Sequence, residues 1–412
     1  MTHPAQPLRR LLAATSLAVA TGLLAPAFGQ ASLEERLQRL EQQMSALQKE
    51  NAQLRSELGL EGRAGQTIVK PAGREPTLSV GGLLQVQSDL GDKGDARFTS
   101  GNDRVYLRRA RLNLQGRFLE EFDFKIEGEF AGSLAEATGN RAQLTDAYLN
   151  WNRYDFANIK VGQFKTPFGY EQLYADPRLL TIERTLVNDR LTASRQLGVQ
   201  VAGDLLDKRL SYATGLFNGT GVNTSANDND KFMWAGRISG VAWQGPLLGQ
   251  DTRWSLGADA LADADSNLPS QPSEFGFDLV PGGTKDAIFA GRRQAGGLDT
   301  QFHSGPFDLW VEYLRERFKP LDAIPSAAFD SAGWYAQAGW FVVPKELQGV
   351  VKFDTFDPNL GVVSNSTKTW TFGVNYFLKG DDIKLQGDYL LTDIDGQPAQ
   401  NRKLILRLQT IF

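Results

Sequence analysis

The chain has 412 residues, of which 41% are hydrophobic and 10% aromatic, and it contains no cysteine. The absence of cysteine excludes disulfides, thiolate metal sites and cysteine nucleophiles. With 44 basic and 48 acidic residues the formal net charge is −4 at pH 7, so a nucleic-acid partner is not indicated. Beyond the N-terminus no stretch approaches the roughly 20 apolar residues of a membrane-spanning helix, so a helical membrane protein is not predicted.

Residues 1–31 have the pattern of a secretory signal peptide. Arg9 and Arg10 form a short basic start, residues 11–24 are an apolar run, and small residues follow. The alternative is an uncleaved N-terminal anchor, for which an apolar run of about 14 residues is short. We therefore predict that the protein is exported.

Residues 32–58 have the pattern of a short coiled-coil helix. Apolar residues recur in alternating steps of four and three, with Asn51 at one seam position. The seam residues are Leu33, Leu37, Leu40, Met44, Leu47, Leu54 and Leu58. A single amphipathic helix lying on another domain is the alternative. Residues 59–76, which contain Gly and Pro, are predicted to be a linker.

From residue 77 to residue 412 the chain consists of segments that alternate apolar and polar residues. In residues 122–130 the odd positions carry Asp123, Lys125, Glu127 and Glu129, whereas the even positions are apolar or glycine. At a period of two these sets lie on opposite faces of one strand. A face with four charges suits a water-filled lumen with lipid on the other side, and does not suit the core of a soluble sandwich.

We count sixteen such segments, separated alternately by short turns and long polar loops. The segments start near residues 77, 105, 121, 143, 157, 195, 209, 232, 253, 293, 306, 331, 348, 366, 382 and 401. Eight long loops and seven short turns are what sixteen antiparallel strands require when both termini lie on the short-turn side, which would be periplasmic. The predicted fold is all-β, a sixteen-stranded antiparallel transmembrane β-barrel with a short N-terminal coiled-coil helix; a soluble all-β protein is the alternative.

The size and chemistry of this barrel indicate a pore. Eight strands leave an interior filled by side chains, whereas sixteen to eighteen leave an aqueous channel. The chain ends in Phe412, preceded by a strand of alternating apolar residues. This ending resembles the C-terminal signature of Gram-negative outer-membrane barrels, so residues 77–412 are predicted to form an outer-membrane pore.

Two blocks of sequence resemble a known family. The first contains Arg108-Arg109-Ala110-Arg111-Leu112, and the second contains Val161-Gly162-Gln163-Phe164-Lys165-Thr166-Pro167-Phe168-Gly169 followed by Glu171 and Ile182-Glu183-Arg184. Together with the signal and the coiled coil, they resemble the phosphate-selective porin O and P family. The resemblance implies a homotrimer of sixteen-stranded barrels whose third loop folds inward to form the constriction.

Basic residues near that constriction are the candidate anion-binding groups. An anion that leaves water needs replacement hydrogen-bond donors and a positive potential. The candidates are Arg109, Arg111, Lys125, Lys160 and Lys165, and the family pattern adds Arg108. Strict alternation places Arg108 and Arg109 on opposite faces of the strand unless a β-bulge intervenes.

Three residues of the long loop are candidate anchors of the constriction. They are Glu171, Glu183 and Arg184. Glu183 would be held by arginines of the barrel wall. Direct contact of the Ile182-Glu183-Arg184 stretch with the permeant ion is the alternative.

The predicted function is passive uptake of small anions, with a preference for phosphate. The alternative is a general or weakly cation-preferring porin, since residues 232–243 and 254–265 supply Arg237 and no ladder of inward arginines. An enzyme is not predicted, because His303 is the only histidine after the signal. Neither a cofactor nor a metal is predicted. The expected partners are small anions, outer-membrane lipid, two further copies of the chain, and a periplasmic protein or peptidoglycan at the coiled coil.

Overall fold

The computed structural model describes residues 38, 42–46, 67–69, 77–95, 97–98, 103–131, 142–269, 288–321, 327–397 and 400–412. The chain divides into two units, Met1–Glu57 and Leu58–Phe412. Residues 38 and 42–46 are helical. The predicted signal peptide and most of the predicted coiled coil lie outside the described residues, so both stay predictions.

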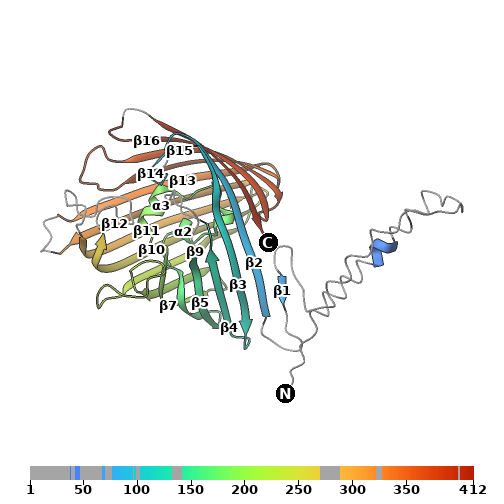
Figure 1. The fold of residues 1–412 in the computed structure, drawn as a ribbon, viewed down its shortest axis with the longest axis horizontal. Coiled ribbons are helices and arrows are strands. Elements are labelled where there is room, and N and C mark those ends of the chain that lie inside the picture. Colours follow the sequence, from blue (N-terminus) through green and yellow to red (C-terminus); the bar gives the residue numbers. More distant parts are fainter. Residues whose placement is uncertain are drawn as a thin grey trace, which may run out of the picture. The chain divides into compact units, whose positions relative to one another are not determined.

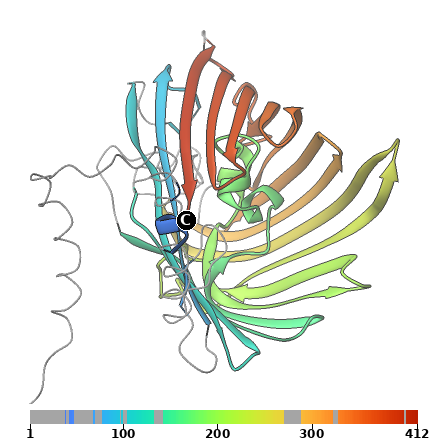
Figure 2. The same ribbon diagram turned by 90° about the vertical axis from the view of Figure 1, so that its right-hand side faces the viewer.

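Sixteen antiparallel strands, β2 to β17, close into a barrel (Figures 1 and 2). Each strand pairs with the next one in the chain, and β17 pairs with β2 to complete the circle. The strands are β2 (Thr77–Gly91), β3 (Arg104–Phe118), β4 (Phe122–Glu129), β5 (Gln143–Tyr154), β6 (Ala157–Lys165), β7 (Arg195–Leu205), β8 (Leu210–Phe217), β9 (Met233–Leu247), β10 (Gln250–Pro269), β11 (Ile288–Ser304), β12 (Phe307–Pro320), β13 (Phe329–Val343), β14 (Leu347–Asp357), β15 (Thr367–Lys379), β16 (Ile383–Ile394) and β17 (Asn401–Ile411).

The predicted sixteen-stranded barrel is confirmed, and every predicted strand has its counterpart. The largest difference in a strand start is at β11, which was expected near residue 293 and begins at Ile288. One additional strand, β1 (Thr67–Val69), lies in the predicted linker and pairs with β2. Its three residues carry too short a pattern to be recognised in the sequence.

The barrel is apolar outside and polar inside, the reverse of a soluble protein. On β4, Glu127 and Glu129 point inward and are 7% and 5% exposed, whereas Ile126, on the opposite face, is 49% exposed. Because a closed barrel pairs all its backbone groups, it satisfies the hydrogen bonds that the bilayer core cannot.

The seam between the first and last barrel strands shows how closely the closure is packed. The backbone of Phe412 exchanges two hydrogen bonds with Gly82, at 2.7 and 3.1 Å. A Cβ atom at Gly82 would lie 2.3 Å from the Phe412 ring. Only glycine therefore leaves space for the terminal aromatic ring at this position.

The short turns carry a band of aromatic side chains on the outer face. Stacked or tilted pairs near these turns include Phe118 with Phe122, Tyr154 with Phe156, and Phe307 with Trp340, at ring-centroid distances of 5.3, 5.3 and 6.1 Å. Such bands lie at the membrane–water interface of outer-membrane barrels. In the part of the chain that is described, no helix is long and apolar enough to cross a membrane.

Candidate pore constriction

The third long connection, residues 166–194 between β6 and β7, folds into the barrel. It contains α2 (Tyr170–Leu173), the 3-10 helix η1 (Asp176–Arg178) and α3 (Leu186–Leu191). Figure 2 shows these green helices within the ring of strands, and α3 contacts β12, β13 and β14. The inward loop that the family resemblance implied is thus present, and residues 166–194 are named the constriction loop below.

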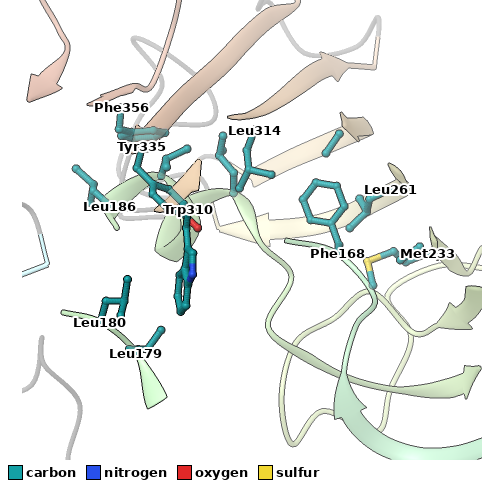
Figure 3. Close-up of a cluster of buried hydrophobic side chains, with 14 of the residues drawn as sticks. Phe168, Leu179, Leu180, Leu186, Met233, Leu261, Trp310, Leu314, Tyr335 and Phe356 are labelled. Carbon is teal, nitrogen blue, oxygen red and sulfur yellow. The ribbon is translucent and has the colours of Figure 1, made fainter. Parts of the chain in front are cut away.

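Apolar side chains hold one face of the constriction loop against the wall. Loop residues Phe168, Leu186 and Val187 are at most 2% exposed. They belong to a cluster (Figure 3) that also contains Phe217, Met233, Leu261, Trp310, Leu314, Tyr335 and Phe356 from the inner wall. Burying one such side chain contributes roughly 1.5–3 kcal/mol. The apolar inward residues of β8 to β14 therefore form the surface against which this loop packs. They are covered by the loop and do not line the open lumen.

Carboxylates of the wall accept hydrogen bonds from the backbone of the constriction loop. Glu312 on β12 accepts from the amides of Tyr170 and Glu171, at 2.5 and 3.2 Å. Asp388 on β16 accepts from the amide of Ile182 at 2.7 Å. These acidic residues satisfy backbone donors that a buried loop would otherwise leave unpaired.

Basic residues of the wall donate to the loop's carbonyl groups. Lys352 donates to the carbonyl of Glu183 at 2.9 Å, and Lys384 donates to that of Pro177 at 2.7 Å. Arg407 donates to the carbonyl of Ile182 at 2.6 Å. The loop is therefore fixed to β12, β14, β16 and β17, on the wall opposite its own root.

Arg108 and Arg109 both face the loop, because a β-bulge interrupts β3. Gln85 pairs with Arg109 while Val86 pairs with Leu107, which leaves Arg108 as the extra residue. Arg108 makes a two-pronged ion pair with Glu183, at 2.8 and 2.9 Å. The sequence left open whether a β-bulge would bring the two arginines to the same face, and the structure contains this bulge.

Glu183 and Asp176 are the acidic centres that hold these arginines. Glu183 also bonds to Arg407. Asp176 forms ion pairs with Arg109 at 3.3 Å and with Arg111 and Arg184 at 2.5 Å each. Arg111 is shared with Glu129 on β4 at 2.7 Å.

The charges around these two carboxylates alter their titration. Burial alone would raise the pKa of Asp176, but Arg109, Arg184 and Arg111 hold it well below the ordinary value. The pKa of Glu183 is likewise lowered, because Arg108 and Arg407 outweigh its burial. Both groups are therefore ionised throughout the physiological pH range.

The three predicted lysines occupy different surroundings. Lys125 forms ion pairs with Glu127 and Asp146 at 2.8 Å each. Lys160 lies over the rings of Tyr148 and Phe164, at 4.6 and 5.3 Å from their centroids.

Lys165 lies at the root of the loop and donates to the carbonyls of Gln172 and Tyr174, at 2.6 and 3.1 Å. Of the predicted anchors, Glu171 accepts from the amide and hydroxyl of Thr185 within the loop, and Arg184 also bonds to the carbonyl of Glu171 at 2.9 Å. The structure thus brings Arg108, Arg109, Arg111 and Lys165 to the constriction loop, where acidic or carbonyl oxygens bind them.

An open cavity of about 600 Å³ lies beside the loop, toward the short-turn end of β8 to β12. Its wall carries four basic side chains, Lys208, Arg209, Arg237 and Arg253. Lys208, Arg209 and Arg253 are exposed to the lumen. The opposite side is formed by loop residues, among them Tyr170 and Tyr174.

Sequence reasoning did not select this group of basic residues. Arg209, Arg237 and Arg253 come from a turn and two strands, and only the strand register brings them together. The amide of Val241, four residues after Arg237, donates to the carbonyl of Arg209 at 2.8 Å. Arg253 is the register partner of His303 on β11. The alternation of polar and apolar residues predicts that these side chains point inward. It does not predict that they lie at the same height in the barrel.

Farther toward the long loops the wall of β10 to β12 is acidic. Asp259 and Asp299 clamp Arg237 at 2.9 and 2.6 Å. Asp263 and Asp265 bind Arg293 at 2.7 and 2.6 Å. Glu316 lies 3.3 Å from the same arginine. Within the described residues no group of three or more His, Cys, Asp or Glu could hold a metal ion.

A closed sixteen-stranded barrel with a polar interior, an apolar outer face and an inward third loop defines an outer-membrane porin channel. The sequence profile of the family described as phosphate-selective porin O and P matches residues 81–412. The chain belongs to this family, as the resemblance in its sequence indicated.

Relatives and solved structures agree with this assignment. Porin O of Pseudomonas aeruginosa is 21% identical over 356 residues, which cover 80% of this chain and 77% of that protein. The anion-selective porin from Comamonas acidovorans has a TM-score of 0.56 at 14% identity, covering 82% of this chain and 100% of that one. OmpT of Vibrio cholerae in its trimer form has a TM-score of 0.55 at 12% identity, with the same coverage. At these identities the solved structures show the fold alone.

Proposed function

We propose that this porin passes small anions by diffusion and prefers anions of the phosphate class. The supporting observation is the cavity beside the constriction loop, with Lys208, Arg209, Arg237 and Arg253 on one wall. Where the lumen is narrow, clustered basic groups raise the local concentration of anions and replace part of their hydration. Arginine fits phosphate oxygens because its fork of N–H donors can bind two of them at once.

The basic residues differ in how freely they can act. Arg237 is clamped by Asp259 and Asp299, so its charge is compensated. Arg209 and Arg253 are exposed in the lumen and carry the anion preference in this proposal. The six residues selected from the sequence would act differently. Arg108, Arg109, Arg111 and Lys165 hold the loop in place, and Lys160 adds positive potential beside it. The charge of Lys125 is compensated by Glu127 and Asp146.

A second candidate, a general or weakly cation-preferring porin, is favoured by one observation. Five buried carboxylates, Asp259, Asp263, Asp265, Asp299 and Glu316, occupy the wall of β10 to β12 on the long-loop side of the cavity. If their field dominates, cations would enter this vestibule first. Arg237 and Arg293 compensate two of these five charges. The proposal therefore requires that the basic residues of the cavity outweigh the remaining three.

The remaining parts of the proposal concern assembly and orientation. We place both ends of the barrel in the periplasm, since the short turns of outer-membrane barrels face that side. The protein would act as a homotrimer, a form in which OmpT of Vibrio cholerae has been solved. The coiled coil would contact peptidoglycan or a periplasmic partner. We assign the chain no enzymatic role.

Planar-bilayer recording with a matched pair of variants tests the function. The double variant R209Q/R253Q removes two positive charges from the cavity, and the control R315Q/R317Q removes two from the outer face of β12. We expect R209Q/R253Q to lower the anion-to-cation permeability ratio several-fold and to weaken the block of chloride current by inorganic phosphate. The control should match the parent protein. Equal selectivity in all three proteins would contradict the assignment of the cavity, and a cation-selective parent channel would contradict anion transport itself.

A further inference from the structure

A group of basic side chains lies on the outer, lipid-facing side of the barrel, at the long-loop end of β11 and β12. Arg315 and Arg317 are 52% and 57% exposed at their side chains, and Arg292 and Lys319 are also exposed. The register places Arg292 opposite Lys319. The alternate residues of β12 are buried on the inner face. Arg292, Arg315, Arg317 and Lys319 are named the outer basic cluster.

Neighbouring aromatic residues show the depth of this cluster in the membrane. Tyr313 is the next outward residue on β12 toward the short turns, and its register partner is Trp334. The Trp334 ring lies 5.3 Å from Phe353, whose ring lies 4.9 Å from Trp370. Such a band marks the membrane–water interface. The outer basic cluster therefore lies at the level of the lipid headgroups, where exposed charges are tolerated.

The cluster carries an excess of positive charge. Asp330 on β13 lies 3.2 Å from Arg315 and 3.9 Å from Arg317. It is the only carboxylate that points outward among the described residues of β11, β12 and β13. Among the described residues of these strands, one acidic group thus faces four basic ones, and the remaining charge attracts anions at the membrane surface.

A groove of about 570 Å³ runs beside these arginines on the same face. Its lining includes Leu298 and Tyr313 as well as Arg315 and Arg317. The groove has free space at Gly296, because a Cβ atom added there would have its nearest neighbour 3.8 Å away. The groove is therefore apolar toward the membrane centre and basic toward the headgroups.

We propose that this groove binds a phosphorylated glycolipid of the outer leaflet, of the lipid A class. A phosphate group would be held by Arg315 and Arg317, whose guanidinium groups can each bind two of its oxygens. An acyl chain would start over Gly296, the register partner of Arg315, and continue over Leu298 and Tyr313 toward the membrane centre. Charge complementarity favours this occupant, because a lipid with an uncharged headgroup would provide no counter-charge for the excess positive charge of the cluster.

The test is the binding of purified diphosphoryl lipid A to the full chain in detergent, measured by native mass spectrometry. R315Q/R317Q should weaken binding about 30-fold, which corresponds to about 2 kcal/mol at 1.4 kcal/mol per factor of ten. R209Q/R253Q, with the same charge change inside the lumen, should bind as the parent does. Because the assay uses micelles, it does not depend on which leaflet the long loops face.

A second pair of variants tests the groove without changing charge. Gly296→Leu fills this free space and should weaken lipid A binding, whereas Gly349→Leu, where a Cβ has nothing within 4 Å, should leave it unchanged. Equal binding by R315Q/R317Q and the parent overturns the proposal, as does equal binding of a lipid A preparation stripped of phosphate. Loss of the trimer with unchanged lipid binding also overturns it, since the cluster would then be a subunit contact.

Discussion

The ion pair between Glu183 and the barrel wall predicts a measurable change in pore behaviour. Glu183→Gln leaves Arg108 and Arg407 without their negative partner, although the glutamine keeps the size of the side chain. Removing one member of a buried ion pair costs about 3–5 kcal/mol. Arg108 is 15% exposed at its side chain, so water compensates in part and the lower end applies. About 3 kcal/mol corresponds to a roughly 100-fold increase in the population with a detached constriction loop.

Single-channel recording detects this detachment directly. The variant should show frequent transitions between conductance levels and a larger mean conductance, whereas the unfolding temperature of the barrel should change little. Asp189→Asn is the matched control, because Asp189 lies in the same loop, is 46% exposed at its side chain and lies 3.7 Å from Arg190. If Glu183→Gln records like the parent and like this control, Glu183 does not anchor the loop.

Two further predictions concern backbone geometry and pH. Gly162 has φ +129°, and a Cβ atom there would lie 2.2 Å from the carbonyl oxygen of Ala147, so Gly162→Ala should destabilise the barrel by about 1–3 kcal/mol. On heating in SDS, this variant should unfold at a lower temperature than the control Gly349→Ala. Equal unfolding temperatures of the two variants would refute the prediction. Because the pKa values of Asp176 and Glu183 are lowered, their stabilisation is complete above their ordinary pKa values and is lost only as the pH falls through the lowered ones. The difference in conductance fluctuations between Glu183→Gln and the parent should thus be constant from pH 8 to pH 5 and decrease only in stronger acid. A difference that already decreases near pH 6 would be the contrary result.

The barrel could be predicted because the alternation of apolar and polar residues is visible in each strand by itself. Alternation along a strand such as β4 separates Glu127 from Ile126 without reference to any other part of the chain. Loop lengths then determine strand count and the side on which each connection lies. The inward loop could not be derived in this way, since its sequence looks like an ordinary polar connection with some apolar residues, and it was expected only from the family resemblance.

The constriction shows where sequence reasoning stops. Arg108 and Arg109 could be selected, but their shared orientation depends on a bulge, which alternation alone does not reveal. Their binding to Asp176 and Glu183 depends on the path of a loop across the lumen. Arg209 and Arg253 were missed because residues 44 positions apart are neighbours in the cavity only through the pairing of β8, β9 and β10.

The central claim, an anion-passing porin, is tested most directly by the reversal potential of the purified protein in a potassium chloride gradient. The positive wall of the cavity predicts a reversal potential displaced toward the equilibrium potential of chloride, with chloride current blocked by inorganic phosphate added at low concentration. A reversal potential displaced toward that of potassium would contradict the account, because the carboxylates of β10 to β12 would then determine the selectivity of the pore.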